Sequence, residues 1–121
     1  MNSEIKTSLD ELTLKIKASK EFQKYTDAKK SWENSKDAQK LLQKYIDTRN
    51  TVRIFQQGNF PGLEEQQELL KSLYKEVDAN TEIQEWGNAQ DTYQQFIWEM
   101  AGYITETTGL DFAPKPKGGC C

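Results

Sequence analysis

Histidine is absent from this chain of 121 residues, and cysteine occurs only as the last two residues, Cys120 and Cys121. The lack of histidine removes the usual general base near neutral pH and the commonest nitrogen ligand of metals. Two adjacent cysteines cannot form a framework of disulfides, so we expect free thiols, which suit a reducing cytoplasm. The sequence also lacks a GxxxxGK phosphate loop, a Ser-His-Asp set and an HExxH motif. We therefore do not expect an enzyme.

Glycine and proline are scarce, with 7 and 3 residues, and no apolar run approaches the roughly 20 residues that cross a bilayer. These shortages exclude a collagen-like chain, a Pro/Gly-rich disordered chain and a membrane-spanning protein. Residues 1–17 show no basic segment followed by an apolar block, so we expect no secretory signal and a cytoplasmic location.

The net charge of −3 is unevenly distributed along the chain. Residues 1–60 carry a net charge of +4, whereas residues 61–112 carry −9. Opposite charges of this kind attract each other within one fold or across an oligomer. Direct nucleic-acid binding is not expected, because the lysines are scattered among acidic residues and the whole chain is acidic.

Apolar residues recur at helical spacing, and no segment alternates with period two for long enough to predict a strand. We predict an all-α fold of antiparallel helical hairpins, forming a single domain over 1–112 with a flexible tail at 113–121. The pattern leaves open whether the second helix continues the first or turns at Ser19. The predicted helices span about 3–18, 19–34, 35–55, 63–77 and 81–108, with a turn marked by two glycines and a proline in 58–62.

Two of these helices carry a clear apolar face. In the first helix, Ile5, Leu9, Leu12 and Ile16 share one side. In the long last helix, alternating steps of three and four residues resemble the seam of a coiled coil. Its apolar surface exceeds what one protomer covers, so we predict the interface of a homodimer or higher homo-oligomer there; the alternative is an intrachain core. The predicted interface residues are Ile83, Trp86, Tyr93, Ile97, Met100 and Ile104.

The chain ends in Gly118-Gly119-Cys120-Cys121, for which three interpretations compete. One is a disordered end without a role, and another is double geranylgeranylation, which would require a GTPase domain that this sequence lacks. The third is soft-metal or iron–sulfur ligation by Cys120 and Cys121. A cluster usually takes four thiolates, so other chains would have to supply the remaining ligands.

Three segments together resemble the YlbF/YmcA family of small all-helical regulators. They read AxxxWExxxDAQKLLxxY, then LLKxLYxEVDANxxIQEW after the Gly/Pro break, then YQQFIxEMAGYI in the long helix. The resemblance covers roughly residues 4–112 and implies a cytoplasmic, oligomerising helical bundle with no catalytic residues.

The resemblance also implies partners and a process. The partners would be paralogous family members and ribonuclease-associated proteins. Complexes of family members with each other and with a further protein assist an endoribonuclease in mRNA maturation. They control competence, biofilm formation and sporulation, and they carry iron–sulfur clusters. Some family members end in a Gly- and Cys-rich tail, and the tail at 118–121 is similar but shorter. We therefore expect a non-enzymatic regulatory adaptor that acts through protein–protein contacts. The alternatives are an iron–sulfur or metal-binding redox protein that uses Cys120 and Cys121, and a purely structural coiled-coil adaptor.

Overall fold

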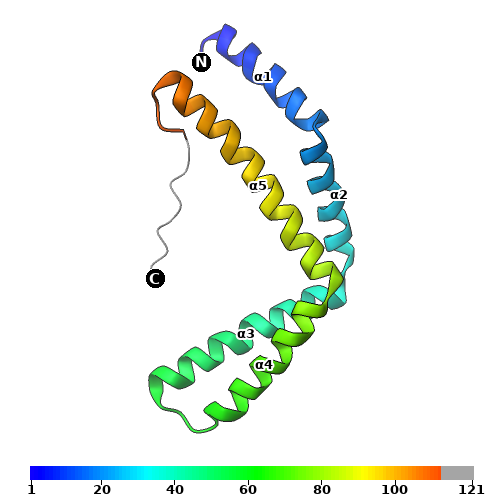
Figure 1. Ribbon diagram of the computed structural model, residues 1–121, viewed down its shortest axis with the longest axis vertical. Coiled ribbons are helices and arrows are strands. Elements are labelled where there is room, and N and C mark those ends of the chain that lie inside the picture. Colours follow the sequence, from blue (N-terminus) through cyan, green and yellow to red (C-terminus); the bar gives the residue numbers. More distant parts are fainter. Residues whose placement is uncertain (113–121) are drawn as a thin grey trace. The chain divides into compact units, whose positions relative to one another are not determined.

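The computed structural model describes residues 1–112, which form five α-helices (Figure 1). Within these residues there is no β-strand, so the all-α prediction is confirmed, as is the long C-terminal helix. The predicted boundaries agree with the observed ones to within one helical turn. The helices are α1 (Ser3–Ala18), α2 (Lys20–Asn34), α3 (Lys36–Gly58), α4 (Leu63–Ala79) and α5 (Thr81–Thr108).

Polar residues at the helix ends explain where the chain changes direction. Ser19 is extended, with ψ of 153°, and its hydroxyl accepts from the N–H of Phe22 at 3.2 Å and donates to the carbonyl of Ile16. This side-chain cap separates α1 from α2 and settles the question that the periodicity left open. Asn80 acts in the same way before α5, where its Oδ1 accepts from the N–H of Ile83 at 2.9 Å.

The described residues form two compact units. Unit 1 comprises residues 1–26 and 89–112, and unit 2 comprises residues 27–88. The boundaries lie inside α2 and α5, so each of these helices contributes to both units. The single domain over 1–112 stays a prediction, and the predicted tail at 113–121 lies outside the described residues.

Unit 2 contains the hairpin of α3 and α4, which pack against each other in antiparallel orientation (Figure 1). The turn between them places the ring of Phe60 5.7 Å from that of Phe55. All of the buried side chains in the described part of the chain belong to this unit. They are Ala38, Thr48, Val52, Leu73 and Ile83.

Unit 1 consists of α1 and the start of α2 beside the C-terminal part of α5 (Figure 1). Aromatic rings join these segments: Tyr25 stacks on Tyr93 with centroids 4.3 Å apart, and Phe22 meets the same ring edge-on at 6.2 Å. No side chain among residues 1–26 and 89–112 is fully buried. This unit therefore has packed aromatic contacts but no closed core.

In residues 1–112, none of the five helices combines the length and the apolar character that a bilayer span requires.

Candidate interaction surface

The predicted interface residues of α5 fall into both units. In unit 2, Ile83 is buried and Trp86 stacks on Trp32, with centroids 6.2 Å apart and rings inclined by 10°. In unit 1, Tyr93 contacts Tyr25 of its own chain. Ile83, Trp86 and Tyr93 thus pack within the same protomer, and their role between protomers stays a prediction.

The last two predicted interface residues line an open cavity in unit 1. Met100 and Ile104 form part of its wall, and its volume is about 420 Å³. Leu12 of α1 faces them across the cavity, so the cavity lies between α1 and α5. The other lining residues are Phe96, Glu99 and Tyr103.

The apolar stripe of α1 continues this surface. Ile5, Leu9 and Leu12 follow one another at helical spacing and are 56%, 45% and 39% exposed. Leu12 belongs both to the stripe and to the cavity wall. The sequence predicts this stripe but no role for it, because helical spacing alone does not tell which helix faces the rest of the chain covers. We call the combined surface the apolar face of unit 1; its members are Ile5, Leu9, Leu12, Met100, Tyr103 and Ile104.

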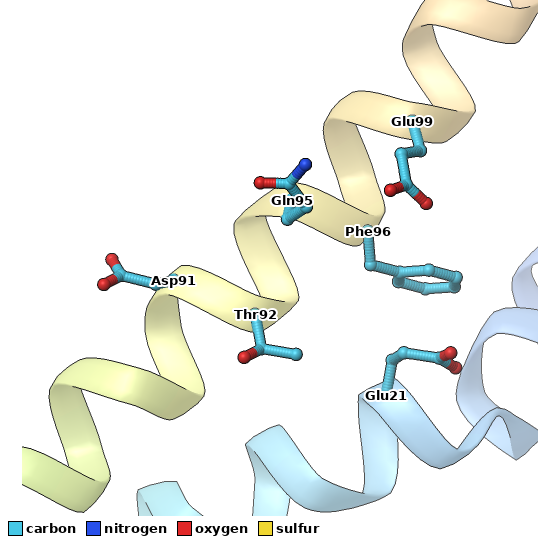
Figure 2. Close-up of a pocket in the computed structure, with 6 residues that line it drawn as sticks. All are labelled: Glu21, Asp91, Thr92, Gln95, Phe96 and Glu99. Carbon is cyan, nitrogen blue, oxygen red and sulfur yellow. The ribbon is translucent and has the colours of Figure 1, made fainter.

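An acidic hollow borders this face on the other side of Phe96. Figure 2 shows the Phe96 ring extending from α5 toward Glu21 of α2, with the Glu99 carboxylate next to the ring. Asp91, Thr92 and Gln95 complete the lining, and the volume is about 370 Å³. Because residues 89–112 carry four acidic side chains and no basic one, this edge of α5 favours contact with basic groups.

The described residues offer no metal centre. Within residues 1–112, no three His, Cys, Asp or Glu side chains lie together in a group that could hold a metal ion. The predicted ligands Cys120 and Cys121 lie outside the described residues, so their fit to an iron–sulfur cluster stays a prediction.

Comparisons with known proteins identify the family of this chain. The family model described as "Control of competence regulator ComK, YlbF/YmcA" matches residues 5–107. The chain is also similar to UPF0342 protein SAG1376 of Streptococcus agalactiae, with 28% identity over 106 residues, which cover 87% of this chain and 88% of the relative. No solved structure matches the chain. Since the family model spans most of the sequence, this chain belongs to the YlbF/YmcA family, which is named for regulators that control competence.

Proposed function

We propose that this protein is a non-enzymatic, cytoplasmic regulatory adaptor that acts by binding other proteins. The observation that carries the proposal is the apolar face of unit 1, on which Ile5 and Tyr103 are 56% and 68% exposed. Monomeric proteins rarely leave a contiguous apolar patch in water, and such patches mark contact sites for macromolecules. An open apolar cavity between two helices, with Glu99 as its one carboxylate, suits a protein partner better than a small substrate.

The process that we propose for this protein is inferred from its family. We infer that the chain supports endoribonuclease-dependent mRNA processing and, through it, competence, biofilm formation and sporulation. Its partners would be paralogous family members and ribonuclease-associated proteins. The match to competence regulators over residues 5–107 supports this inference.

The test is made in the native host with the gene deleted and restored. We expect the tagged wild-type chain, expressed at its natural level, to co-purify with an endoribonuclease and with paralogues. We also expect the deletion strain to accumulate unprocessed transcripts, detected by mapping of mRNA 5′ ends. Unchanged 5′ ends together with a partner set that lacks any ribonuclease would contradict the proposal and favour a purely structural adaptor.

A further inference from the structure

Unit 2 contains a second pocket, of about 380 Å³, whose wall includes two stacked tryptophans. Trp32 of α2 and Trp86 of α5 are both half-buried, and their ring centroids are 6.2 Å apart with planes inclined by 10°. Rings at this distance pack directly on each other and leave no room for a third group between them. A ligand of this pocket would therefore lie against the indole surface that borders the cavity.

Contacts outside the pocket hold the two tryptophans in place. The backbone carbonyl of Trp32 accepts from the N–H of Ser35 at 3.0 Å, which fixes the last turn of α2. Trp86 follows the buried Ile83 by three residues, directly after the turn of α5 that Asn80 caps. The indole wall is thus preorganised, so a ligand need not spend binding energy on ordering it.

The rest of the α2 side is built from small side chains. Ala28, Ser31 and Ser35 line the pocket. Ala28 lies four residues before Trp32 and Ser35 three residues after it, so both flank the indole on the same helix face. Their size leaves space beside the ring, and the serine hydroxyl oxygens can accept hydrogen bonds from a ligand.

The charged residues that line the pocket are all acidic: Asp27, Glu82 and Glu85. Glu82 and Glu85 precede Trp86 by four residues and by one residue, so Glu82 shares a helix face with the indole. Within residues 1–112, however, no three acidic, histidine or cysteine side chains gather into a group that could hold a metal ion. The carboxylates are spread around the indoles, which suits a cation larger than a metal ion.

Indole rings and dispersed carboxylates together favour a guanidinium group. Tryptophan is the best aromatic partner in cation–π contacts, and arginine makes such contacts more often than lysine. A guanidinium is planar, stacks on aromatic faces and is more weakly hydrated than an ammonium group. It also carries five N–H donors, which can reach carboxylates on more than one side.

We propose that this pocket binds an arginine side chain of a partner protein. The guanidinium stacks on the wall formed by Trp32 and Trp86, and its N–H groups donate to Glu82 and Glu85. Arginine is among the residues that most often carry the binding energy of an interface, so one such pocket can anchor a partner. The inference rests on the proposed function, in which the protein acts by binding other proteins, and it adds a site in unit 2 to the apolar face of unit 1.

The first experiment follows the indole N–H signals of the three tryptophans in proton–nitrogen correlation spectra of the full chain. The probe is the capped peptide Gly-Arg-Gly, titrated from about 0.1 to 50 mM, a range that brackets millimolar dissociation constants. We expect saturable shifts of the Trp32 and Trp86 signals and no shift of Trp98, which lies in unit 1. The same peptide with citrulline, a neutral isostere of arginine, should bind at least about tenfold more weakly, because it lacks the cation.

A matched pair of variants tests the carboxylates. Glu85 and Glu68 are both exposed glutamates of unit 2, but only Glu85 lines the pocket. We expect Glu85→Gln to weaken binding of Gly-Arg-Gly at least about threefold and Glu68→Gln to leave it unchanged, although both remove the same charge from the chain. Both positions are exposed, where substitutions rarely disturb folding, and circular dichroism checks the helical signal.

The indole wall is tested by Trp86→Leu, which should abolish the saturable shift of the Trp32 signal. If Trp86→Leu loses its helical signal, the comparison of Glu85→Gln with Glu68→Gln decides.

Three results would overturn the proposal: no saturable shift of the Trp32 and Trp86 signals, equal shifts with the citrulline peptide, or equal weakening by the two glutamine variants. Tighter binding of choline than of Gly-Arg-Gly would assign the pocket to a small quaternary ammonium compound, and would also overturn it. None of these results touches the co-purification and transcript mapping that test the proposed function, so failure of the one is distinguishable from failure of the other.

Discussion

Two residues with positive φ shape the turn between α3 and α4: Asn59, with φ of 51°, and Gly62, with φ of 91°. The glycines and proline of 58–62 predicted a turn, because they are the strongest local breakers. They did not predict that Asn59 would end α3 in the left-handed conformation. Asparagine is among the few residues with a side chain that tolerate it, and this preference is too weak to locate the position from sequence.

Gly62 and Gly87 should respond in opposite ways to alanine. At Gly62 an added Cβ meets only Phe55 at 3.7 Å, so the cost comes from the positive φ, and we expect Gly62→Ala to lower the free energy of unfolding by about 1–2 kcal/mol. Gly87 is inside α5 with no atom within 4 Å of an added Cβ, and Gly87→Ala should raise stability by about 0.5–1 kcal/mol. Chemical denaturation measures both. Changes of the same sign would contradict the assigned backbone conformations.

The residues between helices provide a second comparison. Asn80 accepts a hydrogen bond from the N–H of Ile83, whereas the Ser35 side chain makes no capping bond to α3 and donates instead to the carbonyl of Ser31. We expect Asn80→Ala to cost about 1 kcal/mol, the usual value of a lost N-cap, and Ser35→Ala to cost less than about half of that. Urea titration of both variants checks the order. A larger loss for Ser35→Ala would mean that the caps have been assigned wrongly.

At the scale of elements, hydrophobic periodicity predicted the positions of the helices well. It did not predict which segments pack against the apolar face of each helix. The stripe of α5 is evident in the sequence, yet nothing along the chain shows that Tyr93 would stack on Tyr25 of its own protomer. The same limit left the stripe of α1 without a role. Helical spacing reports which side chains share a face, while the partner of that face depends on contacts between residues distant in the sequence.

Within α5, two neighbouring positions test the orientation of the helix. Ile97 is half-buried and Gln94 is exposed. Ile97→Asp places a carboxylate among apolar side chains and should lower stability by about 2 kcal/mol or more, with a lower melting temperature. Gln94→Asp should change the melting temperature far less, as is usual for exposed positions. Equal melting temperatures for the two variants would show that α5 presents a different face.

At the scale of the whole molecule, the buried core belongs to only one of the two units. Every buried side chain among residues 1–112 lies in unit 2, although both units contain apolar helices. Composition could not predict this division: Leu9 and Leu12 are as apolar as Leu73, yet they are 45% and 39% exposed against 2% for Leu73. The difference arises because α3 and α4 pack against each other as a hairpin, whereas α1 has no buried side chain.

This division predicts unequal local stability in a single protomer. The wild-type chain is measured at low concentration, so that contacts between molecules do not protect either unit. Opening of α1 then exposes little surface that was not exposed already, whereas opening of the α3–α4 hairpin exposes Val52 and Leu73. Since the cost of local opening follows the apolar surface that opening exposes, we expect amides of α1 to exchange at least about tenfold faster than those of α3. Hydrogen exchange followed by mass spectrometry resolves the two segments, and equal protection would mean that unit 1 holds a core of its own.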